Sequence, residues 1–315
     1  MKKYKTIVAD PPWKYGKWGK ASVPNYEGHV PKEITAPDCI FVGDMHLRQD
    51  IPICRTDNFQ EAQWRKVAEI NRYQKKYNCP VYHAGDLFNH WKPSPWLLAK
   101  AIQTLPNLFY TNYGNHDLPQ HNLEQKEHAG IYVLECAGAV TVTPDGHWGD
   151  APYIFKIKNR TIMLHHVMVW AGNVPPWPGC TDMSAAEMLQ AFPEPDIIVT
   201  GHNHQTFIHK EGSRILLNPG SLTRQKSDQT NHVPCIYFYY AETNTLKEVE
   251  LTYEKNVVTR EHIEEKEQRD SRISAFVETL SGDWEGVVSF ENVLESFIQK
   301  SKAKESVVKI IKEAL

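Results

Sequence analysis

Short apolar runs alternate with longer amphipathic stretches through the first third of the chain. The runs at residues 39–42, 80–84 and 108–110 have the length and composition of buried strands. Between the first two runs, apolar residues recur at helical spacing, at Phe59, Ala62, Val67, Ile70, Tyr73 and Tyr77. Strands and helices in this alternation predict a parallel sheet with right-handed crossovers.

Helix start signals support both helices of this region. Asn58 is the predicted N-cap of the first helix, with Glu61 completing a capping box. Ser94 precedes Pro95 at the start of the second helix, where the missing N–H of proline costs no hydrogen bond. The apolar face of the second helix comprises Leu97, Leu98, Ala101, Ile102 and Leu105. Both helices are therefore expected to cover a sheet.

Beyond residue 131 the pattern changes to shorter strands. We predict strands at 139–143, 153–157 and 161–164, with residues 158–160 as a hairpin turn between the last two. A short helix near 184–192 precedes an apolar strand at 196–200, and a further strand covers 215–217. The fold class expected from this pattern is α/β.

Composition limits the class of protein. Of 315 residues, 41% are hydrophobic and 23% charged, which fits one large globular domain, alone or with appendages. A net charge of −3 gives no global basic field for coating nucleic acid, although it does not exclude a nuclease. The six cysteines show no Cys-x-x-Cys pair, so free thiols are expected. The chain shows neither a signal-peptide core nor an apolar run near the roughly 20 residues of a membrane span, which predicts a cytoplasmic protein without a membrane partner.

Five apolar strands are followed by side chains that bind metals. These are, in chain order, Asp44 with His46, Asp86, Asn115, His165, and His202 with His204. The carboxyl ends of parallel strands lie at one edge of a sheet, so these side chains are expected to meet. The donors are nitrogen and oxygen without thiolate, which favours manganese, iron or zinc. Because the set is too large for one tetrahedral ion, we expect two divalent metals that share a carboxylate.

The motifs at these strand ends resemble those of the calcineurin-like metallophosphoesterases. In chain order they are Asp44-x-His46, Gly85-Asp86, Gly114-Asn115-His116-Asp117, His165, and Gly201-His202-x-His204. The resemblance covers residues 38–253 and implies a four-layer α/β/β/α sandwich with mixed sheets. It also implies a two-metal hydrolase that cleaves phosphodiester bonds with a hydroxide held between the metals.

The same resemblance implies roles for individual residues. The first metal would be held by Asp44, His46, Asp86 and His204. The second would be held by Asp86, Asn115, His165 and His202, so that Asp86 bridges the two. His116 would protonate the leaving oxygen, with Asp117 orienting its imidazole. The glycines that precede Asp86 and His202 would let the backbone approach the ions closely.

Two positions leave the assignment open. His166 follows His165 directly, and strand alternation puts the two side chains on opposite faces, so only one of them can be the ligand. We expect His165, because the ligand of related proteins usually follows the apolar run at once. Many relatives carry a carboxylate where this chain has Asn89, which we interpret as a structural residue.

Substrate classes are indicated by weaker resemblances. Asp-x-His-Leu at 44–47 and Gly-Asp-Leu-Phe at 85–88 resemble SbcD-type DNA repair exonucleases. Asn-Pro-Gly-Ser at 218–221 resembles a turn of the phosphodiesterase branch. A nucleic-acid strand is therefore the leading substrate and manganese the leading metal, with a small-nucleotide phosphatase or cyclic phosphodiesterase as the alternative. A non-catalytic scaffold is disfavoured because every ligand is present.

Two terminal segments stand apart from the domain at 38–253. Residues 1–37 contain Asp10-Pro11-Pro12-Trp13, which resembles the catalytic signature of adenine-N6 methyltransferases. No Gly-rich strand, turn and helix for the sulfonium cofactor follows, which predicts an inert extension. Residues 254–315 form a predicted helical appendage with apolar stripes, which we expect to pack on the catalytic domain, on a second copy of the chain or on a partner protein.

Overall fold

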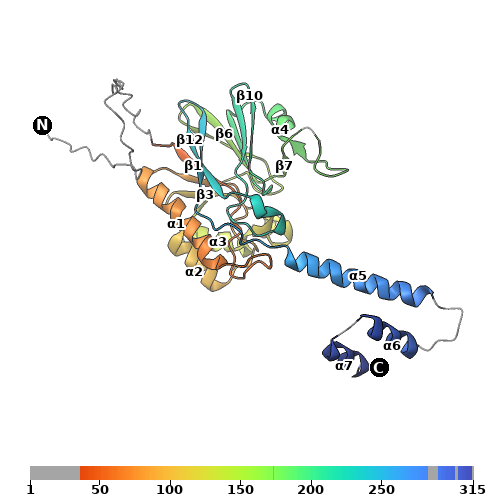
Figure 1. Cartoon of the computed structure of the whole chain (residues 1–315). Coiled ribbons are helices and arrows are strands. Elements are labelled where there is room, and N and C mark those ends of the chain that lie inside the picture. The colour runs from red at the N-terminus through yellow and green to blue at the C-terminus, as the bar shows by residue number, and fades with distance from the viewer. Residues whose placement is uncertain (1–35, 173, 283–289, 302–303, 314–315) are drawn as a thin grey trace, which may run out of the picture. The chain divides into compact units, whose positions relative to one another are not determined.

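The computed structural model describes residues 36–172, 174–282, 290–301 and 304–313 (Figure 1). The described residues from Pro37 onward belong to one compact unit, Pro37–Leu315. The motif at residues 10–13, which belongs to the predicted inert extension, lies outside the described residues.

The first sheet has six strands in the order β13-β12-β1-β2-β3-β4. Its parallel half comprises β1 (Cys39–Val42), β2 (Val81–His83), β3 (Phe109–Thr111) and β4 (Thr141–Val142). On the other side of β1, β12 (Cys235–Tyr240) pairs antiparallel with β1 and with β13 (Thr245–Glu250). The predicted parallel order of the first three strands is confirmed.

Three helices cover the outer face of this sheet: α1 (Phe59–Tyr77), α2 (Pro95–Thr104) and α3 (Gly130–Cys136) (Figure 1). The predicted N-caps are confirmed, since the Asn58 side chain accepts from the N–H of Glu61 at 3.2 Å and Ser94 accepts from Leu97 at 3.2 Å. Ile40, Val42 and Val81 pack beneath the helices in one apolar core, which holds the parallel strands in place.

The second sheet has five strands in the order β10-β11-β9-β6-β5. They are β10 (Phe207–Glu211), β11 (Arg214–Asn218), β9 (Ile197–Thr200), β6 (Arg160–His165) and β5 (Tyr153–Ile157). β9 runs parallel to both of its neighbours, whereas β5 and β10 are antiparallel to theirs. Helix α4 (Ala185–Ala191) and the short pair β7 (Val169–Trp170) and β8 (Met183–Ser184) cover its outer face.

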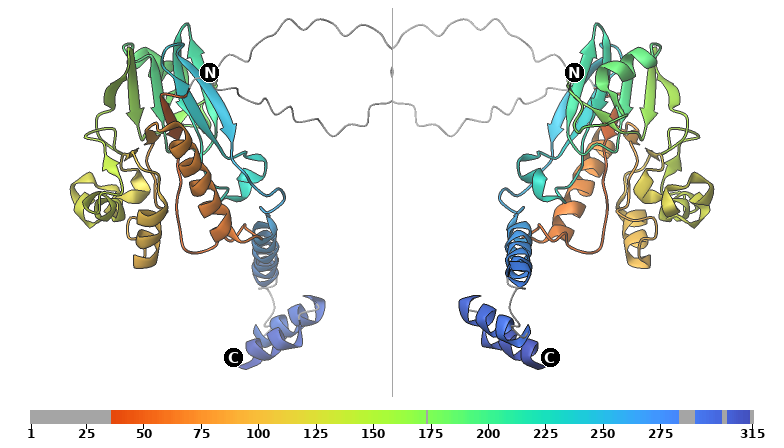
Figure 2. Two further views of the ribbon diagram at one scale, coloured as in Figure 1. Left: turned by 90° about the vertical axis from the view of Figure 1, so that its left-hand side faces the viewer. Right: turned by 90° about the vertical axis from the view of Figure 1, so that its right-hand side faces the viewer.

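The two sheets face each other across a second apolar core (Figure 2). Phe41 and Tyr237 of the first sheet share this core with Leu164 and Val199 of the second. Met163, which precedes Leu164 in β6, points to the outer face of the second sheet, where it packs with α4. Helices outside and two mixed sheets inside confirm the four-layer α/β/β/α sandwich.

Most predicted strands lie within one or two residues of the observed ones, including the hairpin that joins β5 to β6. Five strands, β7, β8, β10, β12 and β13, were not predicted. Short 3₁₀ helices occur at η1 (Asn115–Asp117), η2 (Pro119–His121), η3 (Leu123–His128) and η4 (Ser227–Asn231).

The last part of the chain contains the helices α5 (Glu261–Gly282), α6 (Phe290–Ser301) and α7 (Glu305–Glu313). Before them, Val258 forms a bridge with Arg55, and the N–H of Thr259 donates to the Cys54 carbonyl at 2.8 Å. Within the described residues, every helix is too short or too polar to cross a membrane.

Candidate metal centre

The predicted ligands lie in loops that leave the two sheets at their shared edge. Asp44 and His46 follow β1, Asp86 follows β2, and Asn115 begins η1 after β3. His202 and His204 follow β9 of the second sheet. The structure brings these six side chains together, and it adds His166, which follows β6.

One group of possible ligands comprises Asp44, His46 and His204. Their ligand atoms all lie within 4.8 Å of one another, although the residues come from opposite sheets. The Nε2 atoms of the two imidazoles are 2.9 Å apart. Three nitrogen and oxygen donors this close to one another form a suitable site for a cation.

A second group comprises Asp86, His166 and His202, again with ligand atoms within 4.8 Å of one another. His166 Nε2 lies 3.4 Å from Asp86 Oδ2. The Oδ1 atom of Asn115 lies 2.8 Å from His202 Nδ1 and 3.2 Å from His166 Nε2, so the amide joins this group. Asp86 also falls within 4.8 Å of His46, which places its carboxylate between the two groups.

His165 was the expected ligand, but it lies outside the groups of possible ligands. His166 lies within the second group instead. Along β6, Ile162 and Leu164 point between the sheets, whereas Met163 points toward α4. His165 shares the direction of Met163, and His166 shares that of Leu164. His166 is fully buried, with Nδ1 2.6 Å from the carbonyl of Ala84, and it reaches the cluster from between the sheets.

His116 lies at the exposed rim of the cluster. Its backbone N–H donates to Asp86 Oδ1 at 2.8 Å, and its ring meets that of His46 edge to face with centroids 4.7 Å apart. The ring atom Nδ1 lies 2.9 Å from the backbone carbonyl of Asn89. Because a carbonyl only accepts, Nδ1 carries a proton, and Nε2 is the ring atom available to a ligand.

Asp117 does not orient His116 as expected. Its buried carboxylate accepts from the backbone N–H groups of Leu87 at 3.1 Å, Phe88 at 2.9 Å and Gly114 at 3.0 Å. It therefore ties the loop after β2 to the turn before η1, and the Asn89 carbonyl is what holds the imidazole of His116. Asn89 thus serves through its backbone, in keeping with its interpretation as a structural residue.

Glycines allow the loops to close around His166. A Cβ atom on Gly85 would lie 2.4 Å from His166 Nδ1, and one on Gly201 would lie 2.7 Å from the same atom. The sequence predicted an approach of the backbone to the ions at these two glycines; the neighbour that the structure shows at both is the buried imidazole. Asp86 and His202 themselves adopt positive φ angles of 57° and 73°, which residues other than glycine adopt uncommonly.

Burial sets the charge state of the cluster. It lowers the pKa of His46, and it lowers the pKa of His202 to about 4 and that of His204 to about 3, so these imidazoles are neutral and able to coordinate. Burial acts to raise the pKa of Asp86, but the adjacent His166 and His46 overcome it and lower that pKa.

Buried polar atoms without hydrogen bonds are a separate sign that these residues fit divalent cations. Asp44 Oδ2, Asp86 Oδ2 and His46 Nδ1 are buried and have no hydrogen-bond partner. Leaving such atoms unpaired costs about 1–3 kcal/mol each, or more for charged groups. A cation bound between the groups would satisfy the two carboxylate oxygens, and the nitrogen and oxygen donors suit manganese, iron or zinc.

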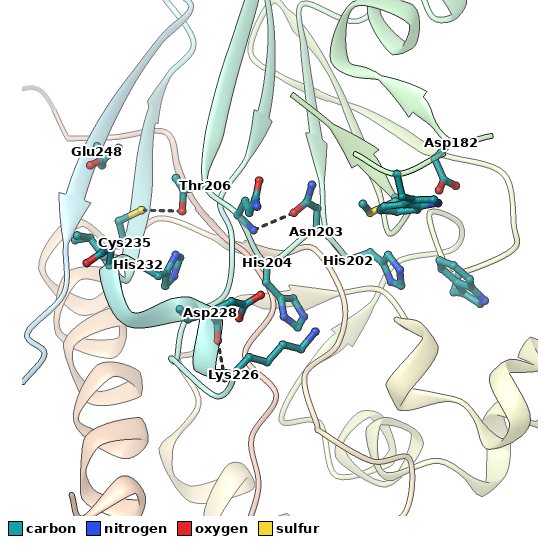
Figure 3. A pocket seen from close by; sticks show the side chains of 17 residues that line it. Asp182, His202, Asn203, His204, Thr206, Lys226, Asp228, His232, Cys235 and Glu248 are labelled. Atoms are coloured by element: carbon teal, nitrogen blue, oxygen red, sulfur yellow. Dashed lines mark hydrogen bonds between the residues drawn. The ribbon is translucent and has the colours of Figure 1, made fainter. Parts of the chain in front are cut away.

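A cavity of about 810 Å³ opens beside the cluster (Figure 3). His202 and His204 form its inner edge, and the loops before β8 and around η4 supply other parts of its lining. The histidine edge therefore faces a space large enough for a small organic ligand. The motif at residues 201–204 supplies one part of this lining, whereas the other parts come from loops without a recognisable pattern.

The fold and the ligand cluster define a metal-binding α/β/β/α sandwich. Residues 38–239 match the calcineurin-like phosphoesterase superfamily domain, and the chain belongs to that family. Membership of this family suggests a metal-dependent phosphoesterase activity. No curated protein shows significant sequence similarity to the chain.

Solved structures with a similar fold have low sequence identity. An archaeal phosphodiesterase is 14% identical, with 68% of this chain and 99% of that chain covered and a TM-score of 0.41. A predicted phosphoesterase from Streptococcus pneumoniae is 17% identical, with coverage of 67% and 96% and a TM-score of 0.33. The vacuolar protein sorting 29 protein from Entamoeba histolytica, solved with zinc, is 18% identical, with coverage of 68% and 97% and a TM-score of 0.33.

Proposed function

We propose that this protein hydrolyses phosphodiester bonds with the help of two divalent cations. The supporting observation is the pair of ligand groups in one volume, with two buried carboxylate oxygens that accept no hydrogen bond. Asp44, His46 and His204 would hold one cation, and His166, His202 and Asn115 the other. Asp86 lies between the groups and would serve both.

The cations would supply Lewis acidity toward phosphoryl oxygens and would lower the pKa of a water molecule toward neutrality. The chain itself orients and protonates. His116 is exposed at the rim, and its Nδ1 is held by the Asn89 carbonyl, so a proton delivered to the leaving oxygen leaves from Nε2. The backbone of His116 is anchored on Asp86, which fixes this imidazole relative to the ligand groups.

The cavity favours a small nucleotide over a continuous nucleic-acid strand, the leading class expected from sequence. Asp182, Asp228 and Glu248 line it, and Lys226 is the one lysine among the described residues of its lining. A groove that follows a nucleic-acid backbone needs an excess of positive charge along its length. This lining suits a substrate with few phosphates, such as a cyclic nucleotide, a dinucleotide or one strand end.

A non-catalytic scaffold is the competing function, since a phosphoesterase fold does not by itself establish turnover. The intact ligand set argues for catalysis. His116 supplies a further argument, because a residue presented to solvent at the rim of a buried cluster contributes little to folding.

The test is to remove metals from the full chain with a chelator, reload it with Mn²⁺, Fe²⁺ or Zn²⁺, and count bound ions by mass spectrometry. Turnover is then measured on bis-p-nitrophenyl phosphate, p-nitrophenyl phosphate, cyclic nucleotides, dinucleotides, and single- and double-stranded DNA. We expect two ions per chain and the fastest turnover on small phosphodiesters. Two bound ions with no turnover of any ester would instead support the scaffold.

A further inference from the structure

The cavity beside the metal centre is lined by aromatic residues as well as by charged ones. Trp148 and Trp177 both contribute to its wall, together with the apolar side chain of Met168. Trp148 stacks on His202 with ring centroids 4.7 Å apart and planes at 27°, and it is partly exposed. The inner end of the cavity therefore has an indole fixed against a residue of the ligand cluster.

Trp177 comes from the loop between β7 and β8. Parallel pairing of Val169 with Met183 closes the base of that loop, and the indole N–H of Trp170 donates to the Asp182 carbonyl at 3.0 Å. Trp177 keeps 47% of its surface exposed. An indole held on an anchored loop at a cavity wall is a suitable stacking platform.

Lys226 lies at the opposite side of the cavity, and its side chain runs alongside the imidazole of His204 (Figure 3). Its backbone is held by an N–H bond to Gln229 Oε1 at 3.0 Å. Within the part of the chain that the structure describes, its ammonium group forms no ion pair. An exposed ammonium without a carboxylate partner, next to a ligand group, suits a phosphate that extends from the metal centre.

The carboxylates of the cavity limit how many phosphates it accepts. Glu248 already accepts from the Tyr237 hydroxyl at 2.6 Å, whereas Asp182 and Asp228 face the cavity with acceptor oxygens. Acceptors of this kind match sugar hydroxyls and base amino groups and repel additional phosphates. The volume of about 810 Å³ is within the range of pockets for single small ligands.

We propose that this cavity is a binding subsite for one nucleotide unit. Trp177, with Trp148, stacks the base, and Lys226 pairs with the phosphate beside His204. This proposal rests on the proposed function, because the unit would be the part of a phosphodiester substrate on one side of the bond that is cleaved. The shared chemistry is a base, a sugar and one phosphate, whether it is a free small molecule or a strand end.

The test uses calorimetry on the full, Mn²⁺-loaded chain with a phosphonate analogue of adenosine monophosphate, which has no phosphate ester bond to cleave. Methylphosphonate and adenosine are titrated separately as fragments. We expect the nucleotide analogue to bind at least about tenfold more tightly than either fragment, since base stacking alone is worth roughly 1–3 kcal/mol. Equal affinities for the analogue and methylphosphonate would overturn the subsite.

Variants separate the two halves of the subsite. Trp177→Ala should weaken the analogue about tenfold and leave methylphosphonate unchanged. Lys226→Gln should weaken both phosphonates and leave adenosine unchanged. Trp96→Ala removes another half-exposed indole, outside the cavity, and should change nothing. The subsite is refuted if Trp177→Ala and Lys226→Gln both bind the analogue as the unmodified chain does.

Two readouts keep this test separate from that of the proposed function. Metal content should be the same in all variants, because none of the substituted residues belongs to the ligand groups. If the chain hydrolyses esters but binds no nucleotide analogue, the subsite is refuted and the proposed function still holds. Displacement of the analogue by a single-stranded oligonucleotide would assign the unit to a strand end, and displacement by cyclic or dinucleotides alone would assign it to a free small molecule.

Discussion

At the scale of single residues, the alternation of side chains along β6 decides which of two neighbouring histidines enters the cluster. β6 presents Leu164 and Met163 to different cores, and the two histidines that follow continue this alternation. His166 becomes fully buried among the ligands, whereas His165 remains partly exposed on the other side. Neighbouring residues of the same type therefore have different surroundings and offer a matched pair for substitution.

We predict that His166→Ala binds about one divalent ion fewer per chain than the unmodified protein, because it removes a donor from the second group. His165→Ala should bind metal normally, since its ring lies outside both groups. Ion counts by mass spectrometry after dialysis against a fixed Mn²⁺ concentration distinguish the two. The opposite ranking would return the ligand role to His165.

His116→Ala should retain its metals and lose activity by roughly 10²- to 10⁴-fold on esters with poor leaving groups, the usual contribution of a positioned acid. Esters of p-nitrophenol, whose leaving group needs no proton, should be affected much less. The measurement is kcat/KM on an alkyl ester and a nitrophenyl ester in parallel. Equal losses on both would exclude proton donation.

Asn89→Ala is the matched control for this experiment. The contact to His116 comes from the backbone carbonyl, which alanine also supplies, so activity on both esters should stay within about twofold of the unmodified chain. A large loss in Asn89→Ala would show that the amide side chain has a role of its own.

The ligand types were predictable from the sequence because each follows an apolar run. Six of the seven expected ligands converge in the structure. The partner of Asp117 was not predictable, since the contact of its carboxylate with Leu87 and Phe88 joins residues about thirty positions apart. Adjacency in sequence favoured His116 as its partner, whereas backbone donors in a neighbouring loop are the observed ones.

At the scale of elements, the apolar stripe of α1 was predicted, but its buried polar residues were not. Lys66 is only 2% exposed, and its ammonium donates to the Ala62 carbonyl at 3.3 Å. Burial, followed by the nearby Arg55, lowers its pKa from 10.5 to about 8. A helical wheel places Lys66 next to Val67 and Ile70 but gives no reason for a charge to be there.

We predict that Lys66→Met makes the protein more stable at pH 7. The lowered pKa means that the folded state binds fewer protons than the unfolded state between about pH 8 and pH 10.5. The loss of folding free energy caused by the buried lysine is therefore complete below about pH 8 and disappears as the pH rises through 10.5. The gain should be at most roughly 3 kcal/mol at pH 7 and should shrink toward pH 10.

Urea unfolding of both proteins at pH 7 and pH 10 measures this difference. Lys76→Met on the same helix is the control, because Lys76 is exposed and should show no gain at either pH. A destabilised Lys66→Met at pH 7 would mean that the ammonium is needed for packing at this place.

Two of the strands that were not predicted, β12 and β13, complete the first sheet. β12 and β13 pair with each other, and β12 also inserts beside β1, about two hundred positions earlier in the chain. Nothing local indicates such a partner, and the alternating pattern of β13 is typical of an edge strand with one exposed face. The pattern predicted the parallel core well because its strands follow one another in sequence.

At the scale of the whole molecule, residues 254–259 are tied to the catalytic domain. The N–H of Thr56 donates to the Val257 carbonyl at 3.0 Å, and the guanidinium of Arg224 donates to the Glu254 carbonyl. Arg224 is 97% buried, since only 3% of its surface is exposed, so its donors depend on such partners. These contacts extend beyond residue 253, where the sequence pattern placed the end of the domain.

We predict that a chain ending at residue 260 melts close to the full-length protein, whereas one ending at 253 melts at least about 5 °C lower. The shorter chain takes the Glu254 carbonyl from the buried Arg224, which keeps only the Thr230 carbonyl, and it leaves the Thr56 N–H and the Cys54 carbonyl without their partners. Each kcal/mol lost costs roughly 2–4 °C at this size. Differential scanning calorimetry of the two truncated proteins is the measurement. Identical melting temperatures would mean that residues 254–259 only lie against the domain.

The place of β12 has a consequence for how the protein is made. A ribosome releases β1 long before β12, so the growing polypeptide carries an unpaired β1 edge until some two hundred further residues have emerged. Sheets closed by such distant partners form slowly and are prone to aggregation while incomplete. Because β9 delivers His202 and His204 late in translation as well, the proposed cation sites are complete only after residue 204 has been made. We expect nascent chains to depend on chaperones during that interval.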